Sequence, residues 1–180
     1  GVEVVGCDVN GDGLLDLIVS AWLADGPNNS RTYSGEVSVI FGRRGAWSGE
    51  HELATSKDVW IVGHQAFDSA GSGLGCGDLN QDGMSEIFIG APDADSIGGS
   101  RLDGGQVHII WGRSSWPSVI DLLTDPGTVV YGAKAGDGVG DHAIVAGDVN
   151  GDGRPELVVA AYRAKNQTGS KSIVGKLHVL

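Results

Sequence analysis

The sequence contains few cysteines, few basic residues and no long apolar run. Two cysteines among 180 residues are too few for a small protein held together mainly by disulfide bonds. Twelve Lys and Arg residues against 23 Asp and Glu residues give a formal charge of −11, which disfavours nucleic acid as a partner because phosphate contacts need a positive surface. Apolar runs such as 157–162 extend over only a few residues, so we expect no direct insertion into a membrane.

Helical patterning is also missing, since no stretch keeps an apolar period of 3.6 residues and we therefore expect little helix. Glycine, in contrast, is abundant, with 31 residues, and it lacks the three-residue period of collagen. This composition is typical of a chain with many turns.

The sequence repeats itself with a period of 70 residues. The segment 8–13 returns at 78–83 and again at 148–153. The repeats span approximately residues 1–70, 71–140 and 141–180, of which the last is incomplete, and a one-residue slip places Asp68 opposite Asp137. Because such a period indicates a repeat architecture, we treat residues 1–180 as a single segment of repeated units.

Each repeat contains short β-branched runs bounded by turn residues, which predict strands that we name A to D. These are 2–7, 16–20, 36–41 and 59–63; then 73–77, 86–90, 106–111 and 128–132; and finally 144–147, 156–161 and 176–180, without a strand D. The pattern predicts an all-β fold of about three β-propeller blades, each with four antiparallel strands. In that order the A–B and C–D connections share one side, and the B–C and D–A connections share the other.

Each A–B connection carries the pattern D-x-N-x-D-G-x-x-[DE], which is rich in the hard oxygen ligands that Ca²⁺ prefers. Positions 1, 3, 5 and 9 offer side-chain oxygens, and position 7 offers a backbone carbonyl. The sequence therefore predicts three Ca²⁺ sites. Their ligands would be Asp8, Asn10, Asp12, Leu14 and Asp16; Asp78, Asn80, Asp82, Met84 and Glu86; and Asp148, Asn150, Asp152, Arg154 and Glu156.

Three other ions or motifs fit these loops less well, and a turn without any ion is a further alternative. An EF-hand needs a carboxylate at position 12, where this chain has Val19, Ile89 and Val159. Mg²⁺ prefers to keep several waters, and zinc is disfavoured because the loops offer neither His nor Cys. Asp, Asn and Gly also form turns without any ion, and this alternative stays open.

With these residues in view, the chain resembles the FG-GAP repeats of integrin α-subunit β-propellers and of their secreted relatives. The middle repeat carries the resemblance best, through 73–75, the loop 78–86 and the Gly-Ala-Pro segment 90–92. The resemblance implies a Ca²⁺-stabilised blade array in an extracellular or cell-surface protein, within a larger propeller of seven or a similar number of blades. It also implies a role in adhesion or in binding a protein or glycan ligand.

The long B–C connections at 21–35, 91–105 and 161–175 are candidate ligand loops together with the D–A connections, and solvated loops without a partner are the alternative. Two of them carry glycosylation sequons, at Asn28 and Asn166. Asp141 and His142 are adjacent, but no positioned nucleophile accompanies them, so we expect no enzymatic activity. A non-catalytic accessory propeller of a larger secreted enzyme is the second functional hypothesis.

Two further expectations concern the ends of the array and the cysteines. Because blade arrays close with several blades, we expect the chain to associate with the remaining blades of a parent propeller or with other copies.

Cys7 and Cys76 end strand A in successive repeats. Because inner strands diverge around the channel of a propeller, we expect the two sulfur atoms to be too far apart to join and to remain as two free thiols.

Overall fold

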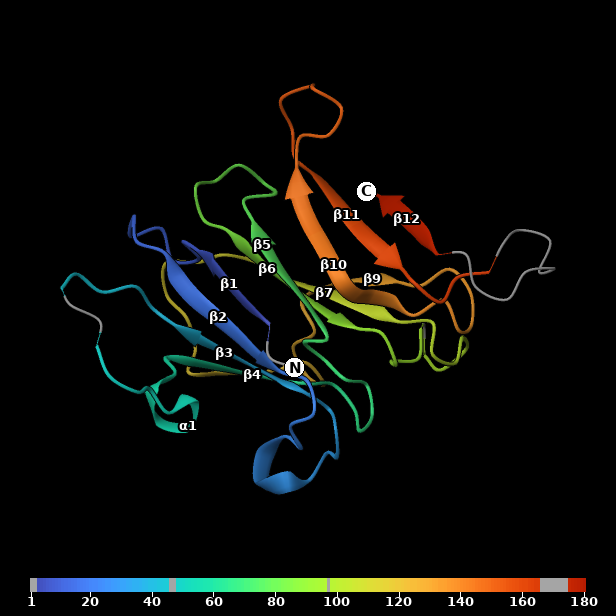
Figure 1. Cartoon of the computed structure of the whole chain (residues 1–180), viewed down its shortest axis with the longest axis horizontal. Helices are drawn as coiled ribbons and strands as arrows, with labels where there is room; N and C mark the ends of the chain where they lie inside the picture. Colours follow the sequence, from blue (N-terminus) through green and yellow to red (C-terminus); the bar gives the residue numbers. More distant parts are fainter. Residues whose placement is uncertain (1–2, 46–47, 97, 166–174) are drawn as a thin grey trace.

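The computed structural model describes residues 3–45, 48–96, 98–165 and 175–180, which form three β-sheets, one for each repeat (Figure 1). Helix is confined to two short turns, η1 (Pro27–Asn29) and α1 (Leu53–Ser56). None of the helices in these described ranges has the length and apolar character needed to cross a bilayer. The prediction of an all-β fold with little helix is confirmed.

The strands follow the order predicted from the sequence, with each consecutive pair antiparallel. The first sheet contains β1 (Val4–Cys7), β2 (Asp16–Ala21), β3 (Glu36–Ile40) and β4 (Val59–Val62). The second contains β5 (Gly73–Gly77), β6 (Glu86–Ala91), β7 (Gln106–Ile110) and β9 (Thr128–Tyr131). The third contains β10 (Val139–Gly147), β11 (Glu156–Ala161) and β12 (Lys176–Val179). Residue 2, the expected start of the first strand, lies outside the described residues.

The middle sheet is packed on both faces, which its strand β6 shows most clearly because all six of its residues are buried. Ile87 and Ile89 belong to a core shared with the first sheet, while Phe88 belongs to a core shared with the third. Strands β2 and β11 instead alternate between buried and less buried positions. The blades therefore bury their apolar faces against their neighbours, as in repeat architectures generally.

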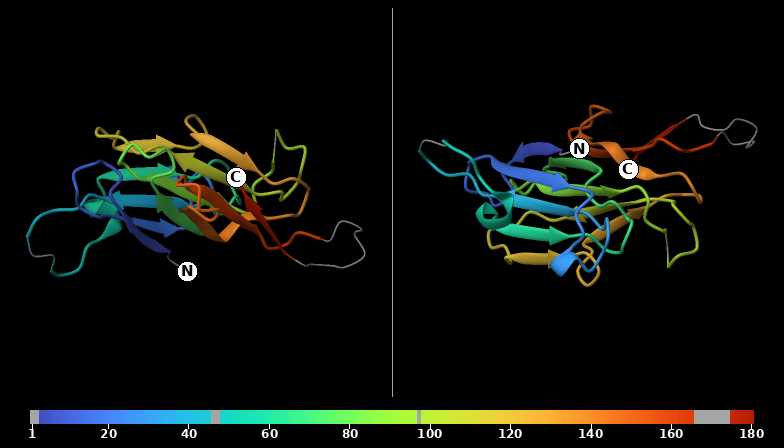
Figure 2. Two further views of the ribbon diagram at one scale, coloured as in Figure 1. Left: turned by 90° about the horizontal axis from the view of Figure 1, so that it is seen from above. Right: turned by 60° about the horizontal axis from the view of Figure 1, so that its bottom comes forward.

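Glycine permits this close packing of neighbouring sheets. A Cβ added at Gly75 would lie 2.3 Å from the backbone oxygen of Ile144, and one at Gly90 would lie 1.7 Å from the oxygen of Gly140. Any larger residue would push the third sheet away from the second. The connections project beyond the strands, and Figure 2 shows the C–D connection of the first repeat (cyan) and the B–C connection of the second (yellow-green) at opposite ends.

One strand was not predicted. Strand β8 (Val119–Asp121) lies in the C–D connection of the second repeat and pairs in parallel with β4 of the first repeat. Asp121 at its end receives two hydrogen bonds from the Arg31 guanidinium, at 2.7 and 2.6 Å. Those hydrogen bonds hold the pKa of the Asp121 carboxyl below its usual value. The second repeat thus adds a fifth strand to the sheet of the first.

The prediction of two free thiols is wrong, because Cys7 and Cys76 form a disulfide with their Cα atoms 6.3 Å apart. Strands β1 and β5 lie side by side (Figure 1). Beside the cysteines, where the strands enter the A–B loops, the Ser85 N–H donates to the Asp8 carbonyl oxygen at 2.8 Å. The stacked sheets thus hold the two Cα atoms within the range that a disulfide can bridge, about 4.4–6.8 Å.

We predict that replacing both Cys7 and Cys76 with Ser destabilises the chain by about 4 kcal/mol, because the disulfide closes a loop across a separation of 69 residues. Denaturant unfolding with and without reductant measures this difference. The double variant should be insensitive to reductant. Finding two reactive thiols in the unreduced, denatured chain would contradict the disulfide.

We predict that Arg31→Met lowers the free energy of unfolding by about 1–3 kcal/mol, since it removes charge-assisted hydrogen bonds that tie β8 to the first repeat. Arg101→Met is the matched control. Arg101 occupies the equivalent position and donates to the Gly132 carbonyl oxygen, as Arg31 does to that of Gly63. A double-mutant cycle with Asp121→Asn isolates the ion pair, and a coupling energy near zero would contradict this role.

Candidate cation-binding loops

The three Asp-rich loops connect β1 to β2, β5 to β6 and β10 to β11, at the same end of their sheets (Figure 1). Neighbouring loops touch. The first and second are joined through the hydrogen bond from Ser85 to Asp8, and the Gln81 side chain of the second donates to the Gly153 carbonyl oxygen of the third at 2.7 Å. The loops therefore form a continuous row across the three repeats.

The first Asp of each loop organises the turn by accepting backbone N–H groups. Asp8 Oδ2 accepts from Gly13 at 2.8 Å, and the equivalent bonds of Asp78 and Asp148 both measure 2.9 Å. The other oxygen of each carboxylate accepts the N–H of position 5, at 3.2, 3.0 and 3.2 Å. In the third loop the N–H groups that this carboxylate accepts, chiefly those of Gly153 and Gly151, hold the pKa of the Asp148 carboxyl below its usual value.

Positions 3 and 5 form a second layer of the same turn. The Asn oxygen accepts the N–H of position 5 at 2.8–2.9 Å, and the Asn amide donates to the carboxylate of position 5. That carboxylate accepts the N–H of position 7, as from Met84 to Asp82 at 2.8 Å. The predicted ligands at positions 1, 3 and 5 are therefore brought together in every loop.

The acid at position 9 lies deeper and differs between the loops. Asp16 is fully buried and accepts the N–H groups of Val9 at 2.8 Å and Gly42 at 2.7 Å. Glu156 accepts the Val149 N–H at 3.0 Å and the Asn150 amide at 2.8 Å. Burial raises the pKa of the Asp16 carboxyl, and the charges of Asp12 and Asp8 raise it further.

Glu86 is the exception among these three acids. It is fully buried, and its Oε2 accepts the Leu79 N–H at 2.6 Å. Its Oε1 is buried without a well-formed hydrogen bond among the described residues. Burial raises the pKa of this carboxyl, and the neighbouring N–H groups of Leu79 and Gly112 only partly offset that effect. An ionised Glu86 therefore has an unsatisfied oxygen directed away from water.

Across the described ranges, no three Asp, Glu, His or Cys side chains converge on one point as a metal cluster would. The reason is geometric, because most carboxylate oxygens of the loops are turned toward backbone N–H groups. These bonds are also what a simple Asx turn would form. The assignment of the fifteen loop positions as ligands stays a prediction.

The B–C and D–A connections, which were predicted to bind a protein or glycan ligand, lie at the opposite ends of the strands. Two of their arginine side chains form hydrogen bonds within the chain. Arg31 and Arg101 donate to the carbonyl oxygens of Gly63 and Gly132 at 2.8 Å. Asn28 of the first sequon is exposed in η1, whereas Asn166 of the second lies outside the described residues. The two arginines thus stabilise their own blades.

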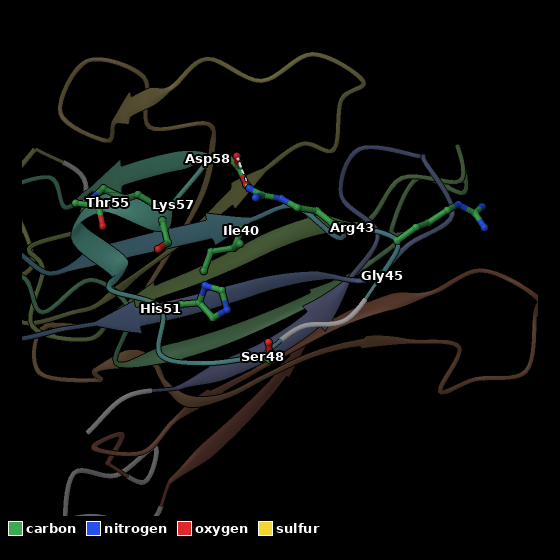
Figure 3. Close-up of a pocket in the computed structure, with 10 residues that line it drawn as sticks. Ile40, Arg43, Gly45, Ser48, His51, Thr55, Lys57 and Asp58 are labelled. Carbon is green, nitrogen blue, oxygen red and sulfur yellow. Dashed lines mark hydrogen bonds and ion pairs between the residues drawn. The ribbon is translucent and has the colours of Figure 1, made fainter.

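A cavity of about 510 Å³ lies under the C–D connection of the first repeat (Figure 3). It has a basic lining, but Arg43 is paired with Asp58 at 3.2 Å. The Lys57 ammonium donates to the carbonyl oxygens of Leu53 and Ala54. These contacts secure the connection around α1, and sequence reasoning had not singled out this cavity.

Comparison with known proteins finds one repeat family and two kinds of similar protein. The profile of the FG-GAP repeat family matches residues 1–40, 70–110 and 140–174. The chain is 28% identical to phosphatidylinositol-glycan-specific phospholipase D of Mus musculus, over 99% of the chain and 20% of that protein. It is 30% identical to integrin alpha-IIb of Mus musculus and 32% identical to integrin alpha-8 of Gallus gallus, in both cases over 91% of the chain and 15% of the integrin. The chain thus spans a fifth or less of these relatives.

We predict that Gly83→Ala destabilises the fold by about 1–2 kcal/mol, because Gly83 has a φ of 88° and Ala pays a steric penalty in the left-handed region. Gly147→Ala is the matched control, since Gly147 lies in β10 outside that region. An added Cβ has open space at both positions. Chemical denaturation compares the two variants, and equal stabilities would contradict the left-handed turn.

Proposed function

Because the chain belongs to the FG-GAP repeat family, we propose that it is a calcium-stabilised segment of an extracellular β-propeller that binds a protein or glycan ligand. In this proposal residues 1–180 form one segment of repeated blades. The Asp-rich loops hold the cations, and the B–C and D–A connections at the other end present the ligand surface.

The buried Oε1 of Glu86 is the observation that carries the calcium proposal. A buried carboxylate oxygen without a hydrogen bond costs free energy unless a cation or donor satisfies it. The same loop offers Asp78, Asn80 and Asp82, which are hard oxygen donors of the kind that Ca²⁺ takes. A bound Ca²⁺ would supply positive charge to these carboxylates. We assign positions 1, 3, 5, 7 and 9 of each loop as its ligands.

The Cys7–Cys76 disulfide supports an extracellular location, because disulfides persist in oxidising compartments. The relatives named as integrins suggest adhesion as the role of this segment. Adhesion requires a ligand-binding surface, which we place at the ends of the strands opposite the Asp-rich loops.

The outer faces of the array support partnership with further blades. On the third sheet Leu177 and Val179 are 64% and 51% exposed, and on the first sheet Val4 is 56% exposed. The corresponding faces of the middle sheet are covered by their neighbours. We propose that the remaining blades of the same propeller cover these faces, and that other copies of the chain are the alternative.

A second function is favoured by the phospholipase relatives, which align with 99% of this chain. In this alternative the segment is a non-catalytic accessory propeller within a larger secreted enzyme. The two functions differ in whether deletion of the segment from the whole protein removes ligand binding or alters an enzymatic activity that another region provides.

We predict that excess EGTA lowers the melting temperature of the chain by about 5–10 °C. A cation present at a hundredfold excess over its Kd stabilises the folded state by about 2.7 kcal/mol. Thermal unfolding followed by circular dichroism measures the shift, and added Ca²⁺ should reverse it while equal Mg²⁺ should not. The same melting temperature with EGTA and with Ca²⁺ would exclude a stabilising cation.

We predict that the effect of Glu86→Gln on the free energy of unfolding differs between EGTA and Ca²⁺. In EGTA the variant should be as stable as the unmodified chain or more stable, because it removes a buried charge. In Ca²⁺ it should be less stable, because it removes a ligand. Glu50→Gln, at an exposed position outside the loops, is the control. Equal destabilisation with and without Ca²⁺ would contradict cation binding by Glu86.

A further inference from the structure

A cavity of about 340 Å³ lies at the ends of the strands opposite the Asp-rich loops, and all three repeats line it. Three of its residues occupy equivalent positions, each directly after strand B of its repeat. They are Trp22 after β2, Pro92 after β6 and Tyr162 after β11. We call this cavity the three-repeat pocket.

A one-residue insertion shapes the pocket. In the second repeat Ser72 alone separates Gly71 from Gly73, whereas in the third Asp141 and His142 separate Gly140 from Ala143. The pairing of β10 with β11 shifts at this point, between Val139 and Ile144. Ser72, Asp141 and His142 all line the pocket, so the bulge places two polar side chains where the second repeat has one.

His142 has a backbone conformation that costs energy, with a φ of 58°. Strain of this kind persists when the surrounding structure holds it, and it concentrates at ligand-binding sites. The His142 side chain is 73% exposed, whereas that of Asp141 is only 12% exposed. The bulge therefore presents an accessible imidazole beside a largely buried carboxylate.

The carboxylates of the pocket already have partners from the chain. Asp93 is paired with Arg163 at 2.7 Å, and the Arg163 guanidinium lies 4.7 Å from the centre of the Tyr162 ring. The His142 imidazole lies 3.4 Å from Asp141 and 3.6 Å from Glu3. Hydrogen-bond donors and acceptors therefore lie side by side in the pocket.

We propose that the three-repeat pocket binds a sugar unit of a glycan. Sugar hydroxyl groups both donate and accept hydrogen bonds, so they match carboxylates that lie beside a guanidinium and an imidazole. The C–H face of a pyranose ring is apolar and packs on an aromatic ring, which Trp22 provides, since Arg163 already covers the Tyr162 ring. The cavity volume lies at the small end of the range for ligand pockets, about 300–1,000 Å³, and suits a single sugar unit or a disaccharide.

This inference rests on the proposed ligand-binding function and names its ligand class. A Lys or Arg side chain of a protein ligand is the competing occupant. It is disfavoured because Arg163 already occupies the Tyr162 face and neutralises Asp93.

The test uses the full chain in Ca²⁺-containing buffer. Binding to a broad array of glycans comes first, followed by calorimetric titration with the methyl glycosides of glucose, galactose, mannose and N-acetylglucosamine. A Gly-Arg-Gly tripeptide amide is titrated in parallel. We expect at least one glycoside to bind, with a Kd raised about tenfold or more by Trp22→Ala and by Asp141→Asn. Trp111→Ala, which removes an exposed Trp at the other end of the strands, should leave that Kd within about twofold.

His142→Gly is a pocket variant that should not weaken the fold, so it separates loss of binding from loss of folding. Glycine accepts the φ of 58° without strain, so this variant should melt at the same temperature as the unmodified chain or above it while losing affinity for the glycoside. Absence of glycan and glycoside binding would overturn the inference. So would a glycoside affinity that the three pocket variants leave unchanged. Tripeptide binding lost in Trp22→Ala, without glycoside binding, would overturn the sugar assignment and leave the proposed ligand-binding function standing.

Discussion

The burial of β6 on both faces is the constraint on which the rest of the structure depends. A strand whose neighbours cover both faces needs apolar or very small residues at every position, and the 86–91 segment supplies them except at Glu86. Close approach also needs glycine where the third sheet crosses, as at Gly90 and Gly140. Once the sheets are stacked in this way, the Asp-rich loops line up at one end of the strands and the three-repeat pocket forms at the other.

Neighbouring repeats are joined by more than apolar contact. The Cys7–Cys76 disulfide links the inner strands of the first two repeats, and β8 with Asp121 extends the second repeat onto the outer edge of the first. Trp116 adds a third link, since its indole N–H donates to the Val9 carbonyl oxygen at 3.2 Å. Between the second and third repeats, the link from Gln81 to Gly153 joins their loops. The first two repeats are thus bound more extensively to each other than a simple stack requires.

Most of the fold could be predicted from the sequence because the strands and turns follow from local patterns repeated every 70 residues. Strand β8 could not, since three residues that pair in parallel with a distant repeat leave no local signal. The disulfide was missed for a related reason: the distance between β1 and β5 is a property of the stacked sheets. At the loops, the sequence predicts the donor atoms, whereas the turn bonds that occupy many of them emerge only from the folded backbone. The three-repeat pocket had one visible signal, the extra residue near Asp141, whose meaning depends on three repeats meeting.

The covalent link between Cys7 and Cys76 has a mechanical consequence for a chain of this kind. If force is applied through the two ends of the chain, the residues between these cysteines cannot be drawn out even after their strands separate. The separation of 69 residues corresponds to about 240 Å of extended chain, and this length does not add to the end-to-end distance of the pulled chain. Under load the first repeat and the start of the second would therefore act as a short, inextensible element, and the rest of the second repeat together with the third would be the part that lengthens.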